Sequence, residues 1–97
     1  MKWLLLIRPR AEADLAKARS RYDKTRPDLG DDFLDEVAAA LRKIETDPER
    51  PMIYYRGFHR VITRRFPYKI FYQVEGHRVI VFRVLHGHQN HPQWLGK

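Results

Sequence analysis

The spacing of apolar residues changes at Pro51, and this change constrains the fold more than any other feature of the sequence. Before it, apolar side chains recur at helical spacing, as at Phe33, Val37 and Leu41, which is typical of a helix with one buried face. After it, short runs rich in Val, Ile, Phe and Tyr follow the period of strands. Because a chain of 97 residues builds one hydrophobic core, we expect a single domain over 1–97.

The first half is expected to form a strand and a pair of helices. The continuous apolarity of the strand predicts burial on both of its faces. Pro9 suits the first turn of a helix, because its missing N–H has no partner there. A loop that ends with Gly30 would separate the helices, and Asp31 or Asp32 would cap the second. The expected elements are a strand over 2–7 and helices over 9–25 and 31–46.

The second half is expected to form a meander of strands joined by tight turns at Arg56-Gly57 and Glu75-Gly76. Strict alternation in the last strand would place Ile80, Phe82 and Val84 on one face. The predicted strands cover 52–56, 59–66, 68–74 and 78–86. The predicted fold class is therefore α+β with two layers: an N-terminal strand, a helical hairpin, and then a three- to four-stranded antiparallel meander.

Positive charge is concentrated in the second half of the chain. The net charge is +7, but residues 1–49 hold ten basic and eleven acidic groups, whereas residues 50–97 hold nine basic groups and one acid, Glu75. This division favours an acidic partner, either nucleic acid or an acidic protein segment. The alternative is a soluble surface with a bias toward arginine.

Several classes of protein are excluded by composition. The sequence has no cysteine, which removes disulfides and thiolate metal sites. Its one long apolar run, 3–7, is too short for a membrane span or a signal peptide, so we expect a soluble cytoplasmic domain. The only serine, Ser20, lies within a predicted helix, which argues against a serine hydrolase. His86, His88 and His91 lack both helical spacing and a nearby carboxylate, so we expect neither a metal nor a cofactor.

Cations and aromatic residues alternate along the predicted strands. Guanidinium groups beside aromatic rings hold phosphates and stack on bases, and with tyrosine or histidine as proton carriers such a cluster could cleave RNA. A purely structural interpretation applies to Tyr72, Phe82 and one of Phe66 or Phe71, whose alternation is that of core residues. The cations are Arg56, His59, Arg60, Arg64, Arg65, Lys69, Arg78 and Arg83, and the aromatic residues include Tyr54, Tyr55, Phe66, Tyr68 and Tyr72.

A series of short motifs resembles the RelE/ParE toxin superfamily of bacterial type II toxin–antitoxin modules, and the ParE branch most closely. The resemblance implies the two-layer fold and a toxin neutralised by a small antitoxin. ParE-like members poison DNA gyrase, and RelE-like members cut messenger RNA on the ribosome. The motifs, in order, are 9–15, Tyr22, 26–30, Phe33-Leu34, 47–50, 55–57, 64–68 with Ile70 and Tyr72, Val84-Leu85-His86, Pro92 and Trp94.

The resemblance also implies roles for individual residues. Lys69 occupies the position of one catalytic arginine of the RelE-type ribonucleases, but their C-terminal arginine and tyrosine correspond to Gln89 and Leu95, so a gyrase inhibitor is expected rather than an enzyme. Many ParE-like chains carry an arginine where this one has Gln89-Asn90. If the chain were a ribonuclease, its catalytic residues would be Arg64, Arg65, Lys69 and His86. The third alternative is a degenerate, non-toxic basic binding module.

The expected partners are the antitoxin and the target. An acidic, amphipathic antitoxin would lay a helix in the apolar groove beside the helical hairpin or add a strand to the sheet edge, with Leu4, Leu6 and Trp94 as anchors. The expected target is DNA gyrase, with the ribosome and its messenger RNA as the alternative. The predicted target-binding residues are Arg56, Arg60, Arg64, Arg65, Lys69, Arg83, His86, His88 and Trp94.

Overall fold

The computed structural model describes residues 3–87. The elements in chain order are β1 (Leu4–Ile7), α1 (Pro9–Thr25), α2 (Leu29–Thr46), β2 (Ile53–Tyr55), β3 (Phe58–Ile62), β4 (Tyr68–Glu75) and β5 (Arg78–His86). This order confirms the predicted α+β class, with an N-terminal strand, a helical hairpin and a meander. Within the described residues, neither helix is long and apolar enough to cross a membrane.

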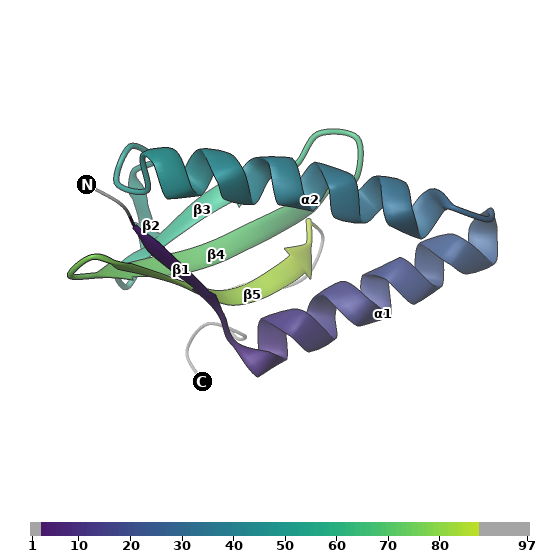
Figure 1. The fold of residues 1–97 in the computed structure, drawn as a ribbon, viewed down its shortest axis with the longest axis horizontal. Helices are drawn as coiled ribbons and strands as arrows, with labels where there is room; N and C mark the ends of the chain where they lie inside the picture. Colours follow the sequence, from purple (N-terminus) through teal and green to yellow (C-terminus); the bar gives the residue numbers. More distant parts are fainter. Residues whose placement is uncertain (1–2, 88–97) are drawn as a thin grey trace.

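The strands form one five-stranded sheet in the order β1-β5-β4-β3-β2. Strands β2 to β5 are an antiparallel meander, and β1 adds a parallel strand beside β5, with Leu4 opposite Arg78 and Ile7 opposite Val81. The helices meet at one end of the molecule and then diverge, so that α2 crosses the sheet while α1 runs beside β5 (Figure 1). The first strand and the last thus lie side by side although almost the whole chain separates them in sequence.

The turn between β2 and β3 has the conformation that its sequence predicts. Arg56 has φ 46° and Gly57 has φ 81°, and the flanking residues Tyr55 and Phe58 pair across the turn. Two consecutive residues with positive φ are typical of a type I′ turn, whose twist matches that of the strands it joins. The turn therefore presents the Arg56 side chain at the end of a hairpin.

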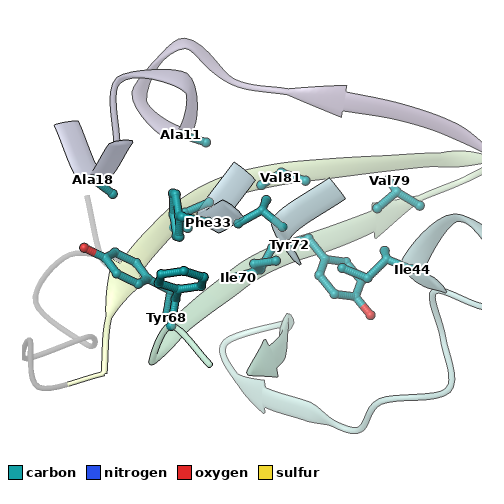
Figure 2. Packing of buried hydrophobic residues seen from close by; sticks show 12 residues of the cluster. Ala11, Ala18, Phe33, Ile44, Tyr68, Ile70, Tyr72, Val79 and Val81 are labelled. Atoms are coloured by element: carbon teal, nitrogen blue, oxygen red, sulfur yellow. The ribbon is translucent and has the colours of Figure 1, made fainter. Parts of the chain in front are cut away.

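The main core lies between the helices and one face of the sheet, which we call the helix face. Phe33 and Ile44 from α2 pack with Ile70, Tyr72 and Val81 from β4 and β5 (Figure 2). At one end of this core, four aromatic rings lie with centroids 4.8–6.2 Å apart. Those rings belong to Tyr22, Phe33, Phe66 and Tyr68.

A second, smaller cluster lies on the opposite face of the sheet, which we call the outer face. It is built on the buried side chains of Phe58, Phe71 and Leu85, with Tyr55 and Phe82 packed against them. The buried side chains of both helices pack in the main core and not in this smaller cluster. The outer face is therefore held together mainly by contacts between side chains of neighbouring strands.

A register shift changes which residues of β5 share a face. The pairing between β4 and β5 is irregular between Phe71 and Tyr72. As a result, Val84 packs in the main core, whereas Phe82 packs in the outer cluster. The prediction that Ile80, Phe82 and Val84 share one face is therefore wrong, because simple alternation does not hold across a bulge.

The first strand is only half buried. Leu5 and Ile7 pack against the main core, but Leu4 and Leu6 are 48% and 39% exposed. The prediction that both faces of this strand are buried is wrong, because β1 is an edge strand and the helices cover only one face of the sheet. An apolar run of this length does not distinguish a central strand from an edge strand.

The second helix begins earlier than predicted. It starts at Leu29, after Asp28 in a left-handed conformation with φ 69°, and the Asp28 side chain makes no capping hydrogen bond. Asp31 and Asp32 lie inside its first turn, where their charges face the positive end of the helix dipole. The predicted capping role of these two residues is therefore wrong.

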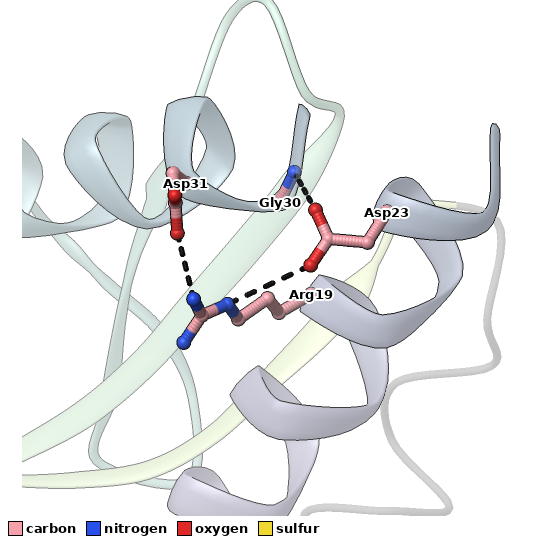
Figure 3. Close-up of polar contacts among 4 residues, drawn as sticks. All are labelled: Arg19, Asp23, Gly30 and Asp31. Atoms are coloured by element: carbon pink, nitrogen blue, oxygen red, sulfur yellow. Dashed lines mark hydrogen bonds and ion pairs between the residues drawn. The ribbon is translucent and has the colours of Figure 1, made fainter. Parts of the chain in front are cut away.

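Gly30 lies within this helix, although the sequence predicted that it ends a loop. Its N–H donates to Asp23 Oδ1 at 2.8 Å. Arg19 then joins Asp23, with Nε–Oδ2 at 3.8 Å, to Asp31, with Nη2–Oδ1 at 2.8 Å (Figure 3). A Cβ atom on Gly30 would lie 2.7 Å from the Arg19 carbonyl oxygen. Glycine is needed here for the close approach of α1 and α2.

Candidate target-binding surface

The outer face carries cations on its central strands. Arg60 of β3 pairs with Phe71, and Lys69 of β4 pairs with Leu85. Because directly paired residues point to the same side of a sheet, both cations lie on the face of the outer cluster. The five strands contain one carboxylate, Glu75, and Arg78 binds it with Nη2–Oε1 at 3.1 Å.

Three arginines stack on aromatic rings around this face. The guanidinium carbon of Arg60 lies 4.1 Å from the centroid of Tyr54, and that of Arg8 lies 4.4 Å from the centroid of Phe82. The Arg56 guanidinium lies 5.4 Å from the ring of Tyr55. Contact with a ring restricts the movement of each guanidinium and does not use its N–H donors in hydrogen bonds. Arg8 was not among the predicted site residues, because it directly precedes a helix in the half of the chain where acidic groups balance the basic ones.

Arg83 does not belong to this surface. It is 9% exposed, and its Nε and Nη2 atoms donate to the two carboxylate oxygens of Asp14 at 2.8 and 2.9 Å. Asp14 Oδ2 also accepts the backbone N–H of Val84 at 2.9 Å, so α1 is fastened to β5. The hydrogen bonds that Arg83 donates to Asp14 raise the pKa of Arg83. The prediction that Arg83 is a surface cation for target binding is therefore wrong: it is part of the helix–sheet joint.

Two more of the predicted strand cations lie toward the helices. His59 is buried, stacked on Tyr72 at 5.1 Å, and its Nδ1 lies 2.6 Å from the Pro51 carbonyl oxygen. Arg65 forms an ion pair with Asp32 at 3.4 Å. Neither residue contributes an isolated positive charge to the outer face.

The loop between β3 and β4 is attached to α2. Glu36 Oε2 accepts the backbone N–H of Arg65 at 3.1 Å and that of Phe66 at 3.4 Å. Arg64, in the same loop, is exposed. This attachment holds Arg65 on the helix side of the sheet.

The four predicted ribonuclease residues do not converge. His86 pairs with Tyr68 and packs against its ring at 5.3 Å, on the helix face. Lys69 is the next residue after Tyr68 and therefore points to the outer face. With Arg65 turned toward α2 and Lys69 on the other side of the sheet, these residues do not surround one reacting phosphate.

The structure also places the predicted antitoxin contacts. Leu4 and Leu6 are exposed on edge strand β1, on the same face as Ile80, which pairs with Leu6. Trp94 and His88 lie outside the described residues.

No group of three or more histidine, aspartate or glutamate side chains within residues 3–87 could hold a metal ion.

A groove runs between the two helices on the surface of the hairpin. It has a volume of about 580 Å³. The half-buried side chains of Leu15 and Leu34 contribute its apolar lining, and Arg19, Asp23 and Lys24 are charged residues around it. Sequence reasoning expected a groove beside the hairpin but did not name its residues. Their positions depend on how the helices diverge, which no local pattern states.

Comparison with known proteins agrees with this fold. A family model for the ParE toxin of type II toxin–antitoxin systems, parDE, matches residues 5–91. A chain of the chromosomal ParDE toxin–antitoxin system from P. aeruginosa superimposes with a TM-score of 0.78 at 15% identity, covering 87% of this chain and 95% of that one. A chain of the toxin–antitoxin complex RelBE2 from Mycobacterium tuberculosis gives 0.55 at 18% identity, covering 89% and 99%.

No curated protein matches the chain. The solved structures share its fold, and the family match extends over most of its length. The chain is thus a toxin of a type II toxin–antitoxin system. Within that class, it belongs to the ParE toxin family.

Proposed function

We propose that this ParE-type toxin inhibits DNA gyrase in the cytoplasm, that it does so through its outer face, and that a cognate antitoxin neutralises it in a module of the plasmid-stabilisation type. Membership of the ParE family is the observation that carries the gyrase target. The outer face is favoured as the working surface because Arg60 and Lys69 lie on it with no carboxylate on the strands except the paired Glu75.

A ribonuclease is the less favoured activity. RNA cleavage needs a base, an acid and a cation around the same phosphate. Lys69 and His86 lie on opposite faces of the sheet, and Arg65 is paired with Asp32. An inhibitor that acts by binding needs no such convergence, so the separation of these groups is compatible with gyrase inhibition.

The test is a supercoiling assay with purified gyrase and increasing amounts of the toxin. Inhibition should fall at least tenfold in the Arg60→Ala/Lys69→Ala variant. The Arg10→Ala/Arg42→Ala variant is the matched control, because it removes the same charge from exposed positions on α1 and α2. Unchanged supercoiling at saturating toxin would refute the gyrase target, and cutting of messenger RNA on programmed ribosomes would establish the alternative activity.

For the antitoxin, we propose an amphipathic helix seated in the groove between α1 and α2. The groove offers Leu15 and Leu34 to an apolar helix face, and the protein's net charge of +7 favours an acidic partner. Edge strand β1 is a second candidate, because Leu4 and Leu6 are exposed and β1 ends the sheet.

Two charge-introducing variants separate these sites. Leu34→Arg should abolish co-purification with the cognate antitoxin if the helix lies in the groove, whereas Leu6→Arg should do so if a strand is added at β1. Loss in neither variant would contradict both sites. A toxin that binds this protein but leaves gyrase unaffected would be the degenerate, non-toxic module.

A further inference from the structure

Four cations on or around the outer face differ from Arg78 and Arg83 in their partners. Arg78 and Arg83 are engaged by Glu75 and Asp14. By contrast, no carboxylate oxygen within residues 3–87 lies within 4.0 Å of a side-chain nitrogen of Arg8, Arg56, Arg60 or Lys69. Three of these four cations are stacked on aromatic rings instead.

We propose that the outer face binds the phosphodiester backbone of a single DNA strand. This inference rests on the proposed function, since DNA is what gyrase cleaves and passes, and it specifies which part of the gyrase–DNA complex the toxin contacts. A stacked guanidinium is already restricted in its movement, so its N–H donors meet a phosphate with less loss of side-chain freedom than a free arginine would incur.

The cations are spread over successive strands of the sheet, so that an extended DNA strand laid across the outer face would meet them one after another. Arg8 stacks over β5, Lys69 lies on β4, Arg60 on β3, and Arg56 in the turn between β2 and β3. Neighbouring strands are about 4.8 Å apart, so the distance across the sheet from β5 to β2 is about 14 Å.

Single-stranded DNA is favoured over a duplex by the aromatic residues. Tyr54 lies beside Arg60 and remains 39% exposed, so one unpaired base can stack on the ring or on the guanidinium. In a duplex the bases are stacked on each other and do not reach a flat protein face. An acidic polypeptide would meet the same cations but has no base to stack beside the exposed ring of Tyr54.

The test measures binding of a fluorescently labelled twenty-nucleotide oligo(dT) to the full-length toxin by anisotropy at several salt concentrations. Each phosphate contact on a single strand adds about 0.7 to the slope of log affinity against log salt. Four contacts give about a 50-fold loss of affinity between 50 and 200 mM salt, and the Arg60→Gln/Lys69→Gln variant should reduce this to about 7-fold. The Arg10→Gln/Arg42→Gln control should keep the original slope.

Four results would overturn the proposal: equal effects of the two double variants, tighter binding to duplex DNA, binding to RNA oligonucleotide alone, or equal binding to polyglutamate. Circular dichroism and urea unfolding establish that each variant is folded. The outcome is independent of the gyrase assay. Oligo(dT) binding by a toxin that leaves gyrase unaffected would refute the proposed function only, and gyrase inhibition without oligo(dT) binding would refute this inference only.

Discussion

The two faces of the sheet use charge in opposite ways. Where the helices meet the sheet, their carboxylates join the layers: Asp14 binds Arg83 and the Val84 N–H beside β5, and Glu36 binds the N–H of Arg65. On the outer face, arginines stack on rings and the strands supply only Glu75. The uneven distribution of acids along the sequence thus becomes a difference between faces. The acidic residues of the first half pair with the cations within their reach. The cations of the outer face remain available for a partner.

The largest expected effect comes from the joint between α1 and β5. Asp14→Ala would leave the buried Arg83 guanidinium and the Val84 N–H without this carboxylate. Breaking one side of a buried pair costs about 3–5 kcal/mol, so urea unfolding should show a loss of that size in the free energy of unfolding.

Asp35→Ala is the matched control, because it removes an exposed carboxylate from α2. Its cost should stay within about 0.5 kcal/mol. Equal losses in the two variants would show that the charges of the helix face do not differ in role from surface charges.

Local signals in the sequence were sufficient to predict most of the helices and strands. Pro9 and Pro27 marked the ends of α1, and β5 was predicted with the bounds it has. The joint could not be predicted, because Asp14 and Arg83 are 69 residues apart and the register shift beside Phe71 changes the alternation that assigned faces. Arg83 was therefore counted among the surface cations.

The cations of the outer face were predicted more accurately than their arrangement. Arg60 and Lys69 were named from composition and resemblance, and the structure places both on one face. Arg8 was missed, because it contacts Phe82 only through the parallel pairing of β1 with β5. Nothing near Arg8 in the sequence indicates that pairing.

The second largest expected effect is a loss of stability at high pH, and it arises at Tyr72 on the helix face. Tyr72 is fully buried and donates a hydrogen bond to the Pro48 carbonyl oxygen at 2.7 Å. Burial, with a contribution from the charge of Asp47, raises its pKa from 10.0 to about 12. Because the folded pKa lies above the unfolded one, this stabilisation is complete below pH 10 and is lost as the pH rises through 12.

Unfolding by urea at pH 8, 10, 11 and 12 measures this loss, which should reach about 2–3 kcal/mol for the unmodified protein. Tyr72→Phe should cost about 1 kcal/mol at pH 8, because the Pro48 carbonyl loses its donor, and should then decline less steeply with pH. Tyr54→Phe removes a hydroxyl from the outer face and should leave the alkaline decline in place. Parallel curves for Tyr72→Phe and the unmodified protein would contradict the assignment.

The smallest effect on stability belongs to the outer face. Arg8→Met keeps an unbranched side chain near Phe82 but removes the stacked charge, and such a cation–π contact contributes about 0.5–1 kcal/mol. A double-mutant cycle with Phe82→Leu, followed by urea unfolding, measures the coupling directly.

If these arginines serve a partner rather than the fold, Arg8→Met should weaken oligo(dT) binding while hardly changing stability. Asp14→Ala should have the opposite pattern, a large loss of stability with little direct effect on binding. A coupling energy of about 3 kcal/mol or more would place the Arg8–Phe82 pair among the structural contacts instead, and would erase the distinction between the two faces.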